Sequence, residues 1–296
     1  MREQLTGDDL FAEILLLSDH RKNILLVEGP DDVATLDSHV AEEHTFVVPG
    51  YGKTSVQYAI DLCDARGINN VLAILDRDWV GIAEAEVSTP NVIYTDLYDL
   101  DATAIFAGDA TKRTVAGLCD PNRVKLHTDS LQLAHIADIG VPTSAAIGVL
   151  RLVTKEQRLP LRLRDFPVQE ILNLDNGAPD IEKMIVIAAA RAASRSTVVD
   201  VENIASLVRA RIDNLANPRR FCSGHDLGMT IATIMRKRWG CTTKADTVIK
   251  TFRVSFGCPE LVSTSLYAKV RSWADDRGLE VWSCPKVLAR AASQLS

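Results

Sequence analysis

The feature that most constrains the fold of this chain is a pair of apolar runs, each followed by acidic residues. Residues 23–27 read Asn-Ile-Leu-Leu-Val, and residues 71–75 read Val-Leu-Ala-Ile-Leu. Uninterrupted apolar runs of this length are typical of buried parallel strands, and ligands of open α/β sheets bind beyond the carboxyl ends of such strands. The residues that follow the two runs include the acidic residues Glu28, Asp32, Asp76 and Asp78.

Four carboxylates at one edge of a sheet repel one another unless a cation lies among them, because like charges raise one another's pKa. Hard divalent cations take oxygen ligands. The sequence therefore predicts that these four residues bind Mg²⁺ or Mn²⁺. An alternative stays open, in which Asp31 or Asp32 only caps a helix and residues 76–78 form a solvated turn.

Strand and helix patterns alternate in the first part of the chain, which predicts a parallel sheet with right-handed crossovers. The expected strands are residues 23–28, 44–48, 70–75 and 91–95. The expected helices are residues 7–19, 31–42 and 53–66.

Beyond about residue 128 the apolar spacing is helical, and no convincing alternation of strands persists. We therefore expect two domains, an α/β domain over residues 1–127 and an α-helical domain over residues 128–296. The expected helices of the second are residues 129–138, 142–154, 180–194, 200–213, 225–239, 260–276 and 285–295.

Composition indicates a protein of the cytoplasm. Hydrophobic residues make up 47% of the chain, which is ample for a packed core. The six cysteines include no Cys-x-x-Cys pair, so neither a zinc site nor a disulfide framework is indicated. We expect no apolar stretch to reach the roughly 18 residues that span a bilayer, and no membrane association is predicted.

Charge is distributed unevenly along the chain. Residues 1–150 carry 10 Lys and Arg against 24 Asp and Glu, whereas residues 151–296 carry 23 against 15, so the formal charges are -14 and +8. A basic half beside an acidic half that holds metal suits a protein that grips and cuts a polyanion. A positive solvated surface on an ordinary helical domain is the other explanation.

A glycine turn precedes one of the expected helices. Residues 49–54 read Pro-Gly-Tyr-Gly-Lys-Thr, but the first glycine of an ATP-binding P-loop would have to stand at Val47. The turn and Lys53 are instead suited to hold one phosphate of a nucleic-acid backbone, or they form a plain helix entry.

Three motifs occur in the order and at the spacing of the Toprim domain, which topoisomerases, primases, small maturation ribonucleases and OLD-family nucleases share. They are residues 28–32 (Glu-Gly-Pro-Asp-Asp), 52–53 (Gly-Lys) and 76–78 (Asp-Arg-Asp). Residues 93–101 and 224–226 resemble the Toprim-like family that includes the effector nuclease of the PARIS antiphage system. The resemblance implies a Toprim fold, with its Rossmann-like parallel sheet, over about residues 20–106.

In Toprim nucleases the glutamate after the first strand and the aspartates after the third coordinate metal ions. The resemblance therefore implies that Glu28, Asp76 and Asp78 bind metal and act in catalysis, with Asp32 as the acidic residue that ends the first motif. Asp101 stands where the PARIS-like family commonly has a glutamate, and it is included as a metal ligand although its side chain is one methylene shorter.

The implied function is a metal-dependent endonuclease of prokaryotic antiviral defence that cleaves tRNA or another cellular RNA. Relatives in the PARIS-like family are held by a companion ATPase and act as dimers. Since this chain has no ATP-binding loop, an ABC-type ATPase would be a separate partner. A homodimer is expected to form through the apolar residues Leu261, Leu266, Val270 and Trp273.

The second half also contains candidate substrate-binding residues. His225 begins an expected helix and suits a proton shuttle or a phosphate contact, while Trp239 suits base stacking. The alternative is that Ser223 or Asp226 caps the helix and His225 lies on the surface. The candidate phosphate contacts are Arg236, Lys237 and Arg238.

Two other function classes stay open. The first is a catalytically silent Toprim-fold module that binds nucleic acid or a partner protein. The second is a phosphotransferase or phosphatase that acts on a small substrate.

Overall fold

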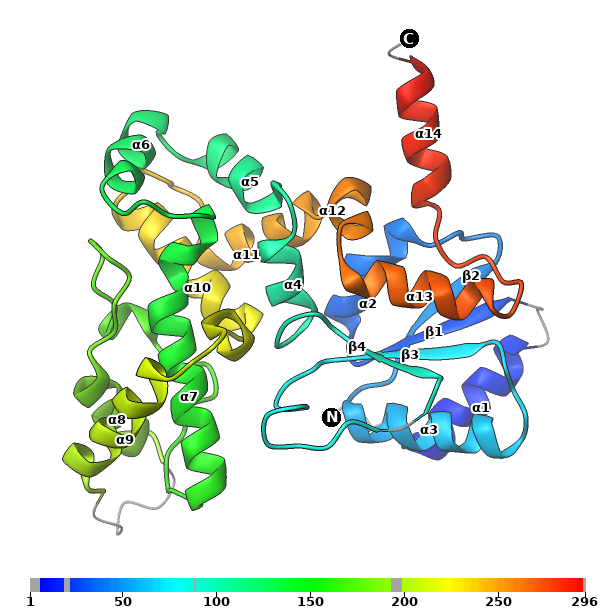
Figure 1. Ribbon diagram of the computed structural model, residues 1–296, viewed down its shortest axis with the longest axis horizontal. Coiled ribbons are helices and arrows are strands. Elements are labelled where there is room, and N and C mark those ends of the chain that lie inside the picture. The colour runs from blue at the N-terminus through cyan, green and yellow to red at the C-terminus, as the bar shows by residue number, and fades with distance from the viewer. Residues whose placement is uncertain (1–5, 19–21, 88, 193–198, 295–296) are drawn as a thin grey trace. The chain divides into compact units, whose positions relative to one another are not determined.

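The computed structural model describes residues 6–18, 22–87, 89–192 and 199–294, and the chain forms two compact units (Figure 1). Unit 1 comprises residues 1–108 and 256–296, and unit 2 comprises residues 109–255. The expected division between residues 1–127 and 128–296 therefore differs from the observed one, because the last segment of the chain packs into unit 1.

The charge asymmetry follows these units. Unit 1 contains 11 Lys and Arg against 24 Asp and Glu, and unit 2 contains 22 against 15. Their formal charges are -13 and +7, so the return of the last segment to unit 1 leaves the asymmetry nearly as the sequence predicts.

Unit 1 is built on a four-stranded parallel sheet with the strand order β2-β1-β3-β4. Every end of an expected strand lies within one residue of the observed end, which confirms the α/β class and the parallel sheet. The strands are β1 (Asn23–Val27), β2 (Thr45–Pro49), β3 (Val71–Leu75) and β4 (Val92–Tyr94).

Both faces of this sheet are covered, so every residue of β1 and β3 is buried, and all but Asn23 are apolar. Successive side chains of a strand point to opposite faces. Leu26 of β1 packs in the core beneath α1 (Gly7–Ser18) and α3 (Lys53–Ala65), whereas its neighbour Leu25 packs in the core of the other face. The expected helix 7–19 is thus present, and its residue 19 lies outside the described residues.

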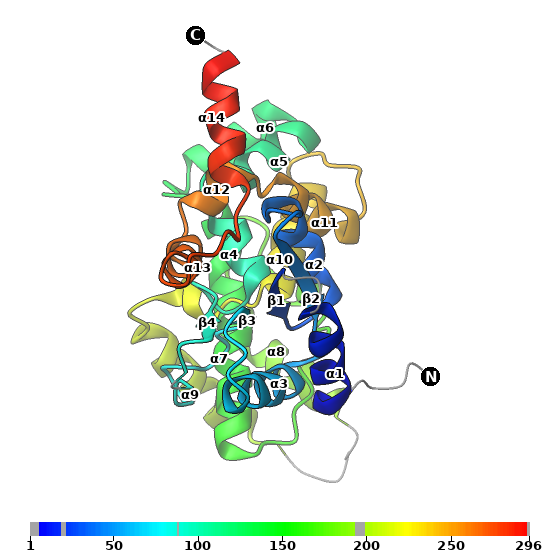
Figure 2. The same cartoon turned by 90° about the vertical axis from the view of Figure 1, so that its right-hand side faces the viewer.

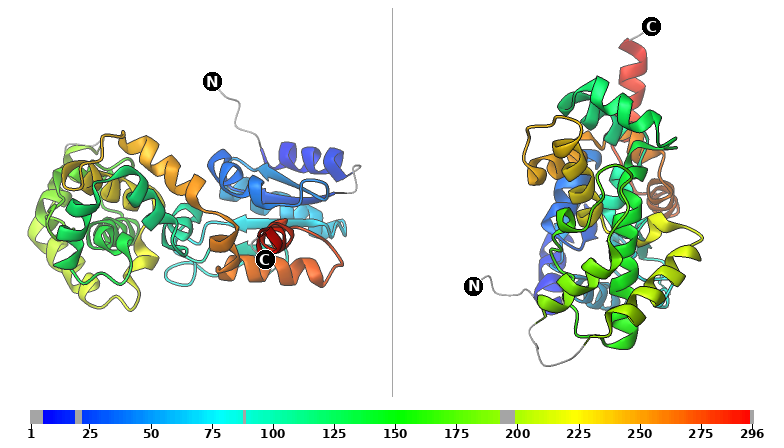
Figure 3. Two further views of the ribbon diagram at one scale, coloured as in Figure 1. Left: turned by 90° about the horizontal axis from the view of Figure 1, so that it is seen from above. Right: turned by 90° about the vertical axis from the view of Figure 1, so that its left-hand side faces the viewer.

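The second face of the sheet is covered by helices from both ends of unit 1. Figures 1, 2 and 3 show α13 on the side of the sheet opposite to α1 and α3. The remaining elements of unit 1 are α2 (Pro30–Leu36), the 3₁₀ helix η1 (Asp37–His39), α4 (Leu100–Phe106), α12 (Cys258–Val262), α13 (Ser265–Asp275) and α14 (Cys284–Gln294).

The apolar residues that were expected to form a dimer face belong to this second core. Each is at most 5% exposed and packs against residues such as Leu72 and Ile74 of β3. The predicted dimer face is therefore wrong, because burying these side chains on the sheet removes them from the surface. The four residues are Leu261, Leu266, Val270 and Trp273.

Unit 2 is helical, as the sequence predicts for most of its length. Its central helix α7 is buried along most of its length and packs against η4, α9 and α10. The elements are α5 (Ala110–Leu118), α6 (Pro121–Asp129), η2 (Ile136–Gly140), α7 (Val141–Gln157), η3 (Val168–Glu170), α8 (Ile181–Ala190), α9 (Val201–Asp213), η4 (Pro218–Phe221), α10 (Gly224–Lys237) and α11 (Ala245–Ser255).

Some expected helices differ from the observed ones. The expected helix 129–138 is wrong, because Gln132 has a φ of 50° in the left-handed region and the His135 side chain caps η2. Helix α6 was not expected from the sequence, because it is polar and has no apolar spacing. Its start is nevertheless marked by Asp120, which caps it, and by Pro121, which begins it. The helices α4, α5 and α11 were likewise not expected, and residues 193–194 and 295 of two expected helices lie outside the described residues.

Among the described residues, one stretch is long and apolar enough to cross a membrane by length and composition, contrary to the sequence expectation. It comprises Ile136–Gln157, and 72% of its most apolar window is buried in the structure. Its packing as the core helix of unit 2 accounts for its apolar composition.

The close approach of α7 and η4 predicts a site that only glycine tolerates. A Cβ at Gly148 would lie 1.9 Å from the carbonyl oxygen of Phe221, so the backbones must separate. We expect Gly148→Ala to lower the free energy of unfolding by about 2 kcal/mol or more, measured by denaturant titration.

The matched control is Gly117→Ala in α5, where an added Cβ meets no atom within 4 Å. This variant should gain about 0.5 to 1 kcal/mol from the higher helix propensity of alanine. Equal stability of the two variants would contradict the packing of α7 on η4.

Candidate functional site

The predicted acidic residues lie at the carboxyl edge of the sheet, where the strand order reverses between β1 and β3. β2 and β3 pair with opposite edges of β1, so the order of the strands changes direction at β1. Ligands of α/β sheets bind at such a point. Glu28 follows β1 and Asp76 follows β3. The Asp76 backbone N–H donates a hydrogen bond to Glu28 Oε1 over 3.0 Å, so the two residues are direct neighbours.

Burial and mutual repulsion perturb both groups. Burial raises the pKa of Glu28 to about 7. The hydrogen bond from Asp76 opposes this effect, and the charges of Asp78 and Asp32 add to it. Burial also raises the pKa of Asp76 well above its ordinary value, with Asp99 as the most effective charged neighbour. Carboxylates that are hard to ionise together are typical of a site built for a cation.

Asp32 takes part in local structure as well as in this electrostatic cluster. Its Oδ2 accepts a hydrogen bond from the Gly29 N–H over 2.8 Å at the start of α2, which is the capping role that the sequence left open. Its charge also raises the pKa values of Glu28 and Asp76, although burial has the largest effect on each.

Lys53 begins α3 and reaches into the acidic cluster. Its Nζ donates to Asp78 Oδ2 and to the Asp76 carbonyl oxygen, both over 2.8 Å. Gly52 makes this possible with a φ of 127°, and its N–H donates to the Glu28 carbonyl oxygen over 2.9 Å. The glycine turn therefore directs an ammonium group at the carboxylates, where it neutralises part of their charge.

Asp99 is the acidic residue of this edge that sequence reasoning missed as a site residue. It caps α4, accepting from the Ala102 N–H over 2.7 Å, and the next residue, Leu100, donates its N–H to Asp76 Oδ1 over 3.3 Å. The predicted ligand Asp101 lies in the first turn of the same helix. The available signal was an aspartate five residues after β4, at a position suited to cap a helix.

The donor set of the edge is made of carboxylate oxygens, which suits a hard divalent cation. Within the described ranges, however, no three of these carboxylates have their ligand oxygens all within 4.8 Å of one another. Two of the carboxylates are engaged in other interactions. Asp78 forms an ion pair with Lys53, and Asp32 accepts a hydrogen bond at the start of α2. Binding of a cation would have to compete with both.

In unit 2, the structure assigns the residues around His225 mainly to structural roles. Ser223 caps α10, and Asp226 is fully buried and forms an ion pair with Arg151 of α7. His225 itself is exposed, as the surface alternative predicted. Trp239 is fully buried and donates its indole N–H to His127 Nδ1 over 2.9 Å, so its predicted role in base stacking is wrong.

The predicted phosphate contacts lie at the exposed carboxyl end of α10. Arg236, Lys237 and Arg238 all face solvent, and Arg238 forms an ion pair with Asp175 over 2.5 Å. Their exposure is compatible with the predicted contact to a polyanion.

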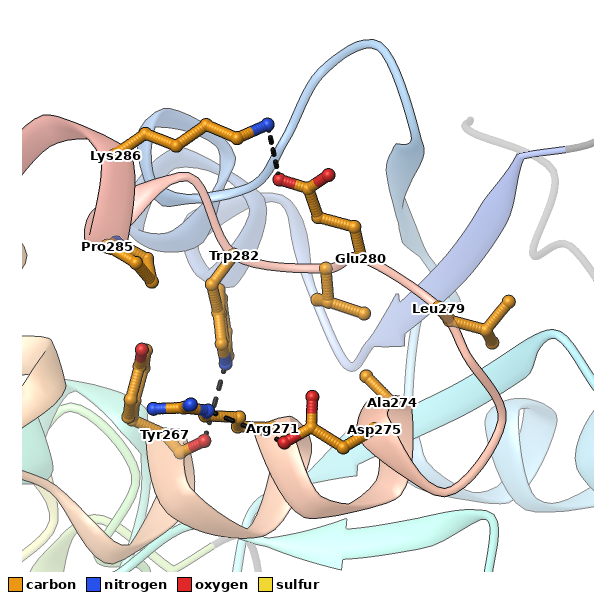
Figure 4. Close-up of a pocket in the computed structure, with 10 residues that line it drawn as sticks. Tyr267, Arg271, Ala274, Asp275, Leu279, Glu280, Trp282, Pro285 and Lys286 are labelled. Carbon is orange, nitrogen blue, oxygen red and sulfur yellow. Dashed lines mark hydrogen bonds and ion pairs between the residues drawn. The ribbon is translucent and has the colours of Figure 1, made fainter.

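A pocket of about 220 Å³ lies between α13 and the segment that leads to α14 (Figure 4). The Trp282 indole N–H donates to the Tyr267 carbonyl oxygen, and Lys286 pairs with Glu280. The Glu280 carbonyl oxygen accepts from Asn23, the first residue of β1, so this pocket lies toward the amino ends of the strands. It is separate from the acidic edge.

Comparison of the sequence with models of protein families and with curated proteins finds no match. The assignment of a function therefore depends on the residues and geometry of the chain itself.

The raised pKa of Glu28 predicts a pH dependence of stability. The folded state holds the Glu28 proton up to about pH 7, whereas the unfolded chain releases it near 4.5. The free energy of unfolding should therefore fall as the pH rises between these values, and Glu28→Gln should remove this part of the loss. In chelator at pH 8 the variant should be about 1 to 3 kcal/mol more stable than the wild type.

Denaturant titrations at pH 5 and pH 8 measure this difference. The control is Asp61→Asn, which removes one negative charge from an exposed position of α3. A pH dependence that Glu28→Gln leaves unchanged would contradict the burial of the Glu28 carboxyl group among like charges.

Proposed function

We propose that this chain is a metal-dependent endonuclease of the Toprim type. The observation that carries the proposal is the direct contact between Glu28 and Asp76 at the point where the strand order reverses, with Asp32, Asp78 and Asp99 close enough to act on the pKa of Asp76. The order of the three sequence motifs supports the same family.

The oxygen donors of the acidic edge fit Mg²⁺ or Mn²⁺, with Glu28, Asp76 and Asp78 as the first candidates for ligands and Asp32 and Asp101 as further ones. When bound, such a cation activates water and stabilises the leaving oxygen of a phosphodiester.

The chain's own groups have separate roles in this proposal. Glu28 Oε1 is occupied by the Asp76 N–H, so its Oε2 holds the proton and releases it near neutral pH. Lys53 balances the charge of Asp78 while the site is empty of substrate, and it is placed to contact a backbone phosphate when that ion pair opens. Arg236, Lys237 and Arg238 add phosphate contacts that increase affinity without reading sequence.

The proposed biological role is that of an effector in prokaryotic antiviral defence, acting on tRNA or another cellular RNA in the cytoplasm. A homodimer and a separate ABC-type ATPase partner belong to this proposal. The support for all three is the resemblance to the PARIS-like family.

One observation favours a second candidate, a catalytically silent module that binds nucleic acid or a partner protein. The Lys53 ammonium group already lies against Asp78 and the Asp76 carbonyl oxygen, where it substitutes for part of the charge of a metal ion. A module of this kind would bind nucleic acid without a divalent cation and would cleave none.

Cleavage assays distinguish the two candidates. The purified chain should cut at least one member of a panel of plasmid DNA, single-stranded DNA, total RNA and tRNA with Mg²⁺ or Mn²⁺. Glu28→Gln and Asp76→Asn should each slow cleavage by more than about 100-fold, because each loses a candidate metal ligand.

Asp61→Asn is again the control and should cut at the wild-type rate. Calorimetric titration with Mn²⁺ gives an independent measurement, since the two site variants should bind it more weakly than the control. Absence of both cleavage and Mn²⁺ binding in the wild type would favour the silent module.

The basic carboxyl end of α10 predicts how affinity depends on salt. Replacing Arg236, Lys237 and Arg238 together with glutamine should make the slope of log affinity against log salt shallower by about 2 to 3, because each phosphate contact contributes about 0.7 to 0.9. Fluorescence anisotropy with a labelled RNA measures the slope. The control replaces the exposed Lys244 and Lys250, and an unchanged slope in the triple variant would place the binding surface elsewhere.

A further inference from the structure

A second group of side chains that could ligate a metal ion lies in unit 1 and shares no residue with the acidic edge. It consists of His39, Cys258 and Cys284, whose ligand atoms all lie within 4.8 Å of one another. His39 is 4% exposed, Cys284 is fully buried, and Cys258 is partly buried. The three residues are far apart in sequence, so they form no Cys-x-x-Cys motif from which the site could be predicted.

The distances within this group are those of a metal site. His39 Nδ1 lies 3.7 Å from Cys258 Sγ and 3.7 Å from Cys284 Sγ. In a tetrahedral zinc site, bonds of about 2.3 Å to sulfur and about 2.0 to 2.1 Å to nitrogen place these ligand atoms about 3.6 Å apart. Each sulfur atom thus lies close to the distance from Nδ1 that a shared zinc ion requires.

The other ring nitrogen of His39 is held as in a metal-binding histidine. His39 Nε2 lies 2.9 Å from the Phe256 carbonyl oxygen, and because a carbonyl oxygen only accepts, Nε2 must carry the proton. A neutral ring then presents the lone pair of Nδ1 to the two sulfur atoms. Metal-binding histidines characteristically donate their second N–H to a carbonyl or carboxylate, which sets the ring orientation.

The surroundings favour a neutral ring, but burial also raises the pKa of the Cys284 thiol, so a bound metal ion would have to displace the thiol proton. Burial lowers the pKa of His39, against the opposing effects of the Phe256 carbonyl and the Glu260 carboxylate. Glu260 is itself 4% exposed and accepts from the Gly257 N–H, so a negative charge is fixed close to the group.

We propose that His39, Cys258 and Cys284 bind a zinc ion through one imidazole nitrogen and two thiolates. Two soft sulfur ligands and one imidazole select zinc over Mg²⁺ or Mn²⁺. The three side chains leave the fourth position of a tetrahedral ion to water or to an exogenous ligand.

The site joins three segments of unit 1, which defines what the ion does. His39 ends η1, Cys258 begins α12, and Cys284 begins α14. Next to it, the Ser283 N–H and hydroxyl group both donate to the His39 carbonyl oxygen, over 2.8 and 3.0 Å. Zinc therefore fastens the returning segment 256–296 to the α/β layer and stabilises unit 1.

Metal analysis of the full chain tests this proposal. After expression with zinc and gel filtration, the wild type should contain about one zinc ion per chain. Cys258→Ser and His39→Ala should each lower the content at least about fivefold. Cys63→Ala, which removes a buried thiol of α3 elsewhere in unit 1, should retain zinc at the wild-type level.

Two measurements on the wild type make the test independent of how well the variants fold. Replacement of zinc by Co²⁺ should produce thiolate-to-cobalt charge-transfer absorption, and removal of the metal by a chelator should lower Tm reversibly. Wild-type protein without zinc, or a Cys258–Cys284 disulfide in freshly isolated protein, would overturn the proposal. Nuclease activity is not a readout, so failure here is distinct from failure of the proposed function.

Discussion

The parallel pairing of β1 with β3 is the interaction on which the candidate site depends. Its register ends with Val27 opposite Ile74, and just beyond it the backbone N–H of Asp76 donates a hydrogen bond to the carboxylate of Glu28. Because the strands are buried on both faces, this pairing holds carboxyl groups in a poorly solvated place. The raised pKa of Glu28 is the direct consequence of that constraint.

The returning segment 256–296 completes the layer that encloses this sheet. Its residues cover the face formed by Leu25 and Leu72, and the Glu280 carbonyl oxygen fixes the segment to Asn23 of β1. The apolar side chains of Leu261, Leu266, Val270 and Trp273 cover this face, so they are not available to a second copy of the chain. The proposed zinc site lies where this segment meets η1, so a bound ion would hold the same segment against the α/β layer.

In unit 2, residues that resemble functional ones mostly hold helices together. The Asp226–Arg151 ion pair joins α10 to α7, and the Trp239–His127 hydrogen bond closes the end of α10 against α6. Such buried pairs are costly to break, since either partner alone would be left buried without its bond. The exposed basic end of α10 and the net charge of +7 of the unit are the features that support the proposed contact with a polyanion.

The sequence by itself determined the strands, their parallel arrangement and four acidic residues of the edge, because apolar runs and turn residues are local signals. Tertiary structure alone decided that Asp99 joins Glu28 and Asp76, that Lys53 points into the carboxylates, and that Trp239 is buried. It also brought together His39, Cys258 and Cys284, for which no spacing rule exists when ligands come from three segments. The physical reason is that burial and charge proximity depend on which segments pack together, and local periodicity does not encode the return of residues 256–296 to the first unit.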